Sequence, residues 1–161
     1  MTASDDLEIK FWKALESDKT VMLGIDGAED GHTRPMTAQI SAHKAPLWFF
    51  TTKDNALVQK LGTHSRAVAT FASKGHDLFA TLQGSLGMET RREVVDSLWS
   101  DSVAAWYPLG KDDPTLALLK FDAQRAEIWR HESSVFTGMR LLFGGAPKKD
   151  RAGDVAEVRL G

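Results

Sequence analysis

Residues able to bind a phosphate group are concentrated between positions 33 and 61. Arg34 can bind a phosphate through two N–H groups at once, and Thr51 and Thr52 are small hydroxyl donors. A short helix is expected to begin directly after them, near Asp54 or Asn55, with free N–H groups at its start. A strand, turn, strand and helix would bring these groups to one place. Taken alone, the segment favours a simpler interpretation, a β-hairpin with an exposed arginine and a capped surface helix.

The rest of the chain shows no self-contained catalytic apparatus. The histidines occur singly and without metal-ligand spacing, so no metal site is predicted; they are His32, His43, His64, His76 and His131. The run GSLG at 84–87 is one residue short of a nucleophile elbow and lies inside a predicted strand. No nucleotide-binding glycine motif is present. Any redox chemistry would therefore need a bound cofactor.

Composition predicts an ordinary soluble globular protein. The chain has 161 residues and a formal net charge of -2, without the basic surplus typical of nucleic-acid binders. It contains no cysteine, which favours a cytoplasmic location. The acidic N-terminus has no signal-peptide pattern, and no apolar run is long enough to cross a membrane. We therefore expect neither nucleic acid nor membrane as a partner.

The pattern of apolar residues and turns predicts a mainly β fold with peripheral helices. The expected strands are 20–25, 33–40, 47–52, 66–72, 78–88, a hairpin made of 116–121 and 125–130, and 155–160. Gly84 and Gly87 indicate a bulge or a close backbone approach within the fifth strand. Short turns between most strands favour an antiparallel barrel.

Helices are expected at 4–17, 55–61 and 89–97, with a further helical turn at 103–108. Ser4 is the expected N-cap of the first helix. An apolar stretch, 135–143, and a basic loop, 147–151, precede the last strand. No linker or repeat is present, so we predict one domain over 1–161, with a C-terminal tail of about 132–161 packed on it.

The tryptophans of this chain are either core residues or candidates for the wall of a flat-ligand pocket. Trp99 is expected to pack a helix onto the barrel. Trp106 lies beside the loop 110–114, which would hold it near a rim. Trp129 shares a strand face with polar neighbours, so it is either half-exposed or part of a cleft.

Several motifs, in order along the chain, resemble the general stress protein branch of the pyridoxamine 5′-phosphate oxidase-like proteins. They are RPM at 34–36, LWFFT at 47–51, LW at 98–99, AWYP at 105–108, GKDDP at 110–114 and AEIW at 126–129. Each motif is short, and the ordered set, above all WYPxGxxDP, is specific. The resemblance covers roughly residues 21–129.

The resemblance implies an antiparallel split β-barrel, the FMN-binding split barrel, that forms a homodimer. It also implies FMN, or FAD, bound in clefts between the two subunits, with Arg34 at the phosphate and Met36 and its neighbours at the flavin ring. The cofactor-binding residues predicted from the resemblance and the local patterns are Arg34, Pro35, Met36, Thr37, Phe50, Thr51, Thr52, Asn55, Lys60, Trp106 and Trp129.

The chain departs from the family pattern in three places. Where relatives often have Ser-Arg-Lys after the phosphate strand, this chain has NAL at 55–57, and Lys60 or Lys53 could substitute. Asp54 puts a carboxylate close to the expected phosphate. The arginine and histidine that bind substrate in true oxidases do not follow Trp129 at the family's spacing, which argues against that enzyme.

Two functions stay open on these grounds. The first is an FMN-binding general stress protein acting as a flavin-dependent oxidoreductase on an unknown substrate. The second is a non-catalytic protein that binds or buffers flavin, or a dimeric split barrel that has lost the cofactor. The sequence does not decide whether the protein is an enzyme, because no catalytic residue is identifiable.

Overall fold

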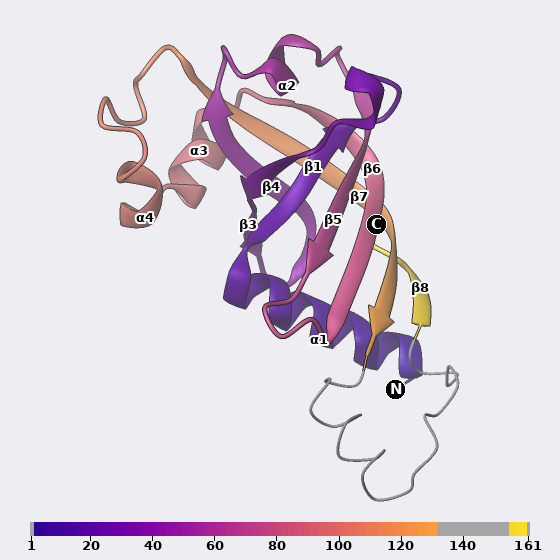
Figure 1. The fold of residues 1–161 in the computed structure, drawn as a ribbon. Helices are drawn as coiled ribbons and strands as arrows, with labels where there is room; N and C mark the ends of the chain where they lie inside the picture. Colours follow the sequence, from indigo (N-terminus) through magenta and orange to yellow (C-terminus); the bar gives the residue numbers. More distant parts are fainter. Residues whose placement is uncertain (1, 132–154, 161) are drawn as a thin grey trace, which may run out of the picture.

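The computed structural model describes residues 2–131 and 155–160, which form one antiparallel sheet and a few helices (Figure 1). The sheet order is β2-β1-β5-β6-β7-β4-β3, and β8 pairs with β7 outside that path. The strands are β1 (Thr20–Ile25), β2 (Arg34–Thr37), β3 (Gln39–Ser41), β4 (Lys44–Thr52), β5 (Ser65–Ala72), β6 (Leu78–Glu89), β7 (Leu116–Arg130) and β8 (Val155–Arg159).

The sheet curls around an apolar core, which includes Leu23, Phe49, Leu82 and Phe121, each fully buried. Residues of β2 approach β4 without pairing with it, so the barrel is split at that point. The structure thus confirms the predicted mainly β, antiparallel split barrel. Alternation of buried and exposed residues along β5 shows the two-residue period that this architecture requires.

Helix α1 (Ala3–Asp18) crosses one end of the sheet and contacts β6, β7 and β8 (Figure 1). Its N-cap is Thr2 rather than the predicted Ser4, because Thr2 and Asp5 form a reciprocal capping box. Phe11 and Trp12 are among the residues that it buries against the core.

The other helices are short. They are η1 (Glu29–Gly31), α2 (Ala56–Gln59), α3 (Arg92–Leu98) and α4 (Asp101–Ala104). In Figure 1, α2 lies at the end of the barrel opposite α1, whereas α3 and α4 form a lobe beside the barrel. We call residues 92–114, which contain α3, α4 and the following loop, the side lobe.

The predicted single strand 33–40 is wrong, since it consists of two strands on opposite sides of the split. β2 pairs with β1, and β3 pairs with β4. Ala38 lies between them, fully buried, and its N–H donates to the carbonyl of Lys19 at 2.6 Å. This backbone bond turns the chain from one side of the barrel to the other.

The predicted hairpin across 122–124 is also wrong, because β7 is continuous from Leu116 to Arg130. The apparent turn is a bulge: the register with β6 shifts between Gln83 and Gly84. A Cβ on Gly84 would lie 2.1 Å from the carbonyl oxygen of Asp122, so only glycine fits there. Gly84 was predicted to mark a bulge or a close backbone approach in the fifth strand, β6. The structure shows the close approach at Gly84, and it places the extra residue of the bulge in the partner strand β7, at Gln124.

The apolar stretch 135–143 and the basic loop 147–151 lie outside the described residues. The predicted last strand is present as β8, which pairs with the second half of β7. Among the helices that the structure describes, none has the length and apolarity needed to cross a membrane.

Candidate functional site

A cavity of about 490 Å³ lies between the split in the barrel and the side lobe. This volume falls in the range of small-molecule sites. The lining residues are Lys19, Pro35, Met36, Thr37, Gln39, Phe50, Ser100, Ser102, Val103, Trp106 and Tyr107. Five of them, Pro35, Met36, Thr37, Phe50 and Trp106, are among the predicted cofactor-binding residues.

One side of the cavity is the free edge of β2. In the described chain this strand pairs only with β1, so one row of its backbone groups has no strand partner. Pro35 and Thr37 are exposed, whereas the Met36 side chain is buried in the core. Met36 therefore borders the cavity largely through its backbone, which suits a planar ligand with a hydrogen-bonding edge.

The opposite side is aromatic. Phe50 contacts Trp99 edge-on at 5.6 Å and Tyr107 at 6.4 Å between ring centroids. Trp99 thus packs the side lobe onto the barrel, as predicted. Burial raises the pKa of Tyr107 above its ordinary value, so its phenol stays neutral in the physiological range. Trp106 is 81% exposed, and an exposed indole at a cavity rim can cover a flat ligand.

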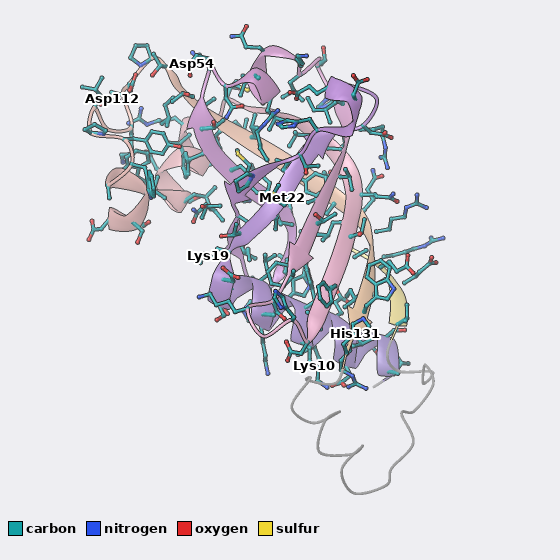
Figure 2. All side chains as sticks on the ribbon, in the orientation of Figure 1. Lys10, Lys19, Met22, Asp54, Asp112 and His131 are labelled. Carbon is teal, nitrogen blue, oxygen red and sulfur yellow. The ribbon has the colours of Figure 1, made fainter. Side chains whose placement is uncertain are left out.

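Charged residues hold the side lobe together at its surface. Arg92 contacts Asp96 at 3.1 Å and Asp112 at 2.7 Å, and Lys111 contacts Asp96 at 3.1 Å. Asp112 is labelled in the lobe in Figure 2. These contacts join α3 to the loop that follows Trp106, and so they help to position the aromatic side of the cavity.

Arg34 does not line the cavity, although it begins the strand that does. Its Nη2 donates to Oε2 of Glu29 at 2.5 Å, and the two side chains are 14% and 10% exposed. The hydrogen bond from Arg34 is the main cause that lowers the pKa of Glu29, so this carboxylate is ionised at neutral pH. Arg34, the residue predicted to bind the phosphate, therefore already binds an anionic side chain of its own chain.

The other residues predicted near a phosphate also have internal partners. Thr51 is buried and accepts a hydrogen bond from Asn55 at 3.0 Å, and Thr52 donates to Asp54. Asn55 caps α2 by accepting from the N–H of Leu57 at 2.9 Å. The alternative interpretation of this segment predicted a capped helix and an exposed arginine. The capped helix is present, but Arg34 is largely buried.

Lys60 ends α2 and is exposed. Its charge contributes to the lowered pKa of Glu29, so Lys60 lies within electrostatic range of the Glu29–Arg34 pair.

Trp129 lies far from the cavity within one chain. Phe50 pairs with Leu118 on β7, and Trp129 follows roughly 35 Å further along that strand at about 3.3 Å per residue. Figure 2 shows the separation: His131, just past the end of β7, lies at the far end of the molecule from Asp112. The predicted contact between Trp129 and the ligand therefore stays a prediction, and it requires a second chain.

Sequence reasoning missed several residues around the site. Tyr107, inside the AWYP motif, was a detectable candidate, because it neighbours Trp106. Lys19, Gln39 and Ser102 carry no local signal, since the fold alone brings them to the cavity. Glu29 lies in a turn-like sequence that gives no indication of a pairing with Arg34. Among the described residues, no cluster of potential metal ligands occurs.

Comparisons with known proteins agree with this architecture. The family model "Pyridoxamine 5'-phosphate oxidase like" matches residues 6–148. A general stress family protein from Xanthomonas campestris is 59% identical over 83% of this chain and 93% of its own, with a TM-score of 0.78. The general stress FMN/FAD binding protein from Xanthomonas citri is 60% identical over 81% of this chain and 92% of its own, with a TM-score of 0.76.

A more distant solved structure, a general stress protein 26 from Jannaschia sp., is 31% identical over 97% of this chain and 99% of its own, with a TM-score of 0.79. No curated protein matches the chain significantly. The chain belongs to the pyridoxamine 5′-phosphate oxidase-like family. Within it, the similarity is to the general stress protein branch, as the sequence motifs predicted.

Proposed function

We propose that this protein binds FMN, with the flavin ring in the cavity and the phosphate toward Arg34. The observation that carries the proposal is the cavity itself, which joins a free strand edge to an aromatic wall. A flavin ring needs both, because its faces are apolar and one edge carries hydrogen-bonding groups. The Xanthomonas citri relative, an FMN/FAD binding protein, supports the same ligand, and FAD is the alternative form.

Residues of this chain fit such a ligand along its length. The backbone of Pro35, Met36 and Thr37 would contact the ring edge, and Phe50 and Trp106 would cover its faces. Arg34 begins the same strand, roughly 10 Å from Thr37 at about 3.3 Å per residue. That spacing suits an extended ribityl phosphate chain. The buried Nη1 atom of Arg34 has no hydrogen-bond partner among the described residues, which leaves it free for a phosphate oxygen.

We further propose a homodimer in which each cavity is completed by the other subunit. Cross-strand neighbours form one row over the outer face of the sheet: Pro35, Met22, Thr70, Thr81 and Glu127. At one end of the row, Pro35 borders the cavity. At the other end is Glu127, and Trp129 lies two residues further along β7. A two-fold axis through the middle of the row would exchange its ends and bring Trp129 of the partner subunit toward the cavity.

Bound flavin would supply electron or hydride transfer, and the protein would bind and orient it. Tyr107 is the one cavity-lining phenol among the described residues, and its raised pKa suits a hydrogen-bond donor rather than a base. A flavin-dependent oxidoreductase of unknown substrate is therefore our first interpretation. A non-catalytic flavin-binding or buffering protein is the second interpretation. It is favoured because the residues predicted to bind the phosphate already form hydrogen bonds within the chain. The absence of cysteine supports a cytoplasmic location.

Titration of the purified protein with FMN and riboflavin tests the ligand. We expect a flavin absorption band, and tighter binding of FMN than of riboflavin. Arg34→Ala should remove most of that difference, a loss of roughly tenfold, because the guanidinium–phosphate contact is charge-assisted. Arg34→Lys should restore only part of it, since lysine cannot bind a phosphate bidentately. A protein that binds neither flavin would refute the proposal.

Light scattering tests the second subunit. Met22 lies in this row, between Pro35 and Thr70, and is 38% exposed, so Met22→Lys should give a monomer that binds FMN weakly (Figure 2). Met88→Lys is the matched control, because Met88 is 40% exposed but lies elsewhere on the barrel. A wild-type protein that is monomeric at micromolar concentration and still binds FMN tightly would rule out the intersubunit site.

A further inference from the structure

The contact between Glu29 and Arg34 is incomplete. Arg34 donates from Nη2 to one oxygen of Glu29, while its Nη1 and the other carboxylate oxygen, Oε1, are buried without a hydrogen-bond partner in the described structure. A guanidinium and a carboxylate that evolved only as a structural pair would be expected to join through two parallel hydrogen bonds. Here one donor and one acceptor of a shielded pair stay unsatisfied, which is costly.

Glu29 is held in this position by an unusual backbone. The loop between β1 and β2 contains two consecutive non-glycine residues in the left-handed region, Glu29 with φ 57° and Asp30 with φ 53°. Such conformations are unfavourable for residues with a Cβ. Gly27 and Gly31 flank them, also with positive φ. The flanking glycines allow this loop to change its backbone without disturbing β1 or β2.

We propose that Glu29 is an internal anion that occupies Arg34 in place of a ligand phosphate and thereby sets the affinity and phosphate preference of the site. This inference rests on the proposed FMN function. While Glu29 is engaged, its charge cancels that of Arg34. Lys60 lies within electrostatic range of the same pair and adds a second positive charge. Nη1 of Arg34 is free for one phosphate oxygen, but a phosphate gains the Nη2 donor and the uncompensated charge only by displacing the carboxylate. It then faces both Arg34 and Lys60. Glu29 thus determines how strongly the protein prefers FMN over riboflavin.

The direct test replaces the carboxylate by a neutral isostere. Glu29→Gln should bind FMN roughly tenfold more tightly than the wild type, since a phosphate no longer competes with a charge-assisted bond. Riboflavin affinity should change less than about twofold, because riboflavin has no phosphate. Glu29→Ala should raise FMN affinity at least as much. Unchanged FMN affinity in both folded variants would overturn the inference.

A matched control separates this effect from the general loss of an ion pair. Glu89 is also a shielded glutamate, 8% exposed, and contacts Arg91 at 2.6 Å away from the cavity lining. Glu89→Gln should leave both flavin affinities unchanged. An equal gain in FMN affinity in this variant would show a non-specific charge effect, and would also overturn the inference.

A double-mutant cycle tests whether Glu29 acts through Arg34. In an Arg34→Ala background, Glu29→Gln should improve FMN binding much less than in the wild type, because no guanidinium remains to be released. The same gain in both backgrounds would mean that Glu29 merely repels phosphate, which contradicts the proposed occupancy.

Thermal unfolding with inorganic phosphate separates this inference from the proposed function. Phosphate should stabilise Glu29→Gln at concentrations that leave the wild type unaffected. If no variant binds flavin but phosphate still stabilises Glu29→Gln selectively, the FMN proposal fails and the internal anion stands. If the wild type binds FMN and phosphate acts on both proteins alike, the FMN proposal stands and the internal anion is refuted.

Discussion

The two ends of the proposed ligand site differ in how much of their hydrogen-bonding capacity is already used. Around the cavity, the edge of β2 has no strand partner, and Trp106 is 81% exposed. Around Arg34, that arginine and the hydroxyl and amide side chains predicted near the phosphate all have internal partners in the described structure. The ring end is therefore preformed, whereas the phosphate end must exchange one set of contacts for another.

This difference indicates how binding energy should be distributed. A preformed pocket binds its ligand without a cost of rearrangement, while displaced internal contacts reduce the net gain. We therefore expect the flavin ring to supply most of the affinity, and the phosphate to add a smaller, adjustable part. Mutations at the ring end should weaken FMN and riboflavin equally, whereas those at the Arg34 end should change their ratio.

The largest effect is expected for Phe50→Ala. Phe50 both lines the cavity and packs the side lobe through Trp99, so its loss should weaken both flavins by more than tenfold. Stability should fall by about 2–3 kcal/mol, less than for a fully buried phenylalanine, because Phe50 is only partly buried. Flavin titration and chemical denaturation measure the two effects. Phe50→Leu is the control, and should retain most of the stability.

Trp106→Ala should affect binding alone. We expect both flavins to bind roughly tenfold more weakly, because an aromatic contact with the ring is lost. The melting temperature should stay unchanged, since the side chain is largely exposed. Leu109→Ala is the control, because Leu109 is 75% exposed in the same lobe but does not line the cavity. A weakening confined to FMN would contradict the assignment of this end to the ring.

Removal of the Glu29 carboxylate should change stability with pH. The pKa of Glu29 in the folded protein lies below its ordinary value of 4.5. The ion pair therefore stabilises the fold above that value, and its contribution is lost as the pH falls through the folded-state pKa. Glu29→Gln should be less stable than the wild type at neutral pH, and the gap should close in acid. Denaturation at several pH values measures this, and a constant gap would contradict the ion pair.

The smallest effect is expected for Asp112→Asn in the side lobe. Its contact with Arg92 is exposed to solvent, so it contributes little. Both flavin affinities should fall less than about twofold, and added salt of about 1 M should remove the difference. Binding titrations at low and high salt check this expectation. A change in the ratio of FMN to riboflavin affinity would show that the side lobe acts on the phosphate end, and would contradict its assignment to the ring end.

Sequence patterns predicted most strands because local alternation and turn residues determine them. Residues 20–25 are the strand β1 itself, and the predicted strand 66–72 differs from β5 by one residue. The two errors arose where tertiary pairing overrides local signals. The residues 122–124 have turn chemistry, but cross-strand pairing with β6 keeps them within β7 as a bulge. Ala38 carries no signal for the bond to Lys19 that divides 33–40.

The lining of the cavity, the candidate site, was predictable to a similar degree. Short motifs located Phe50, Trp106 and residues 35–37, because neighbouring positions in the sequence fall on one strand or one rim. The pairing of Arg34 with Glu29 could not be predicted, since it depends on the backbone of the β1–β2 loop. In the proposed homodimer, the place of Trp129 relative to the ligand depends on how the two chains associate, which no local pattern of the sequence encodes.

The position of β7 in the sheet has a consequence for how the chain folds. This strand comes after β1 to β6 in the chain, and it pairs with β4, β6 and β8. Its contacts with β4 join residues that are far apart in sequence, such as Thr51 and Ala117. The barrel cannot close until this part of the chain has left the ribosome. Until then the apolar faces of β1, β4 and β5 stay open, so folding should be slow and this interval should be prone to aggregation.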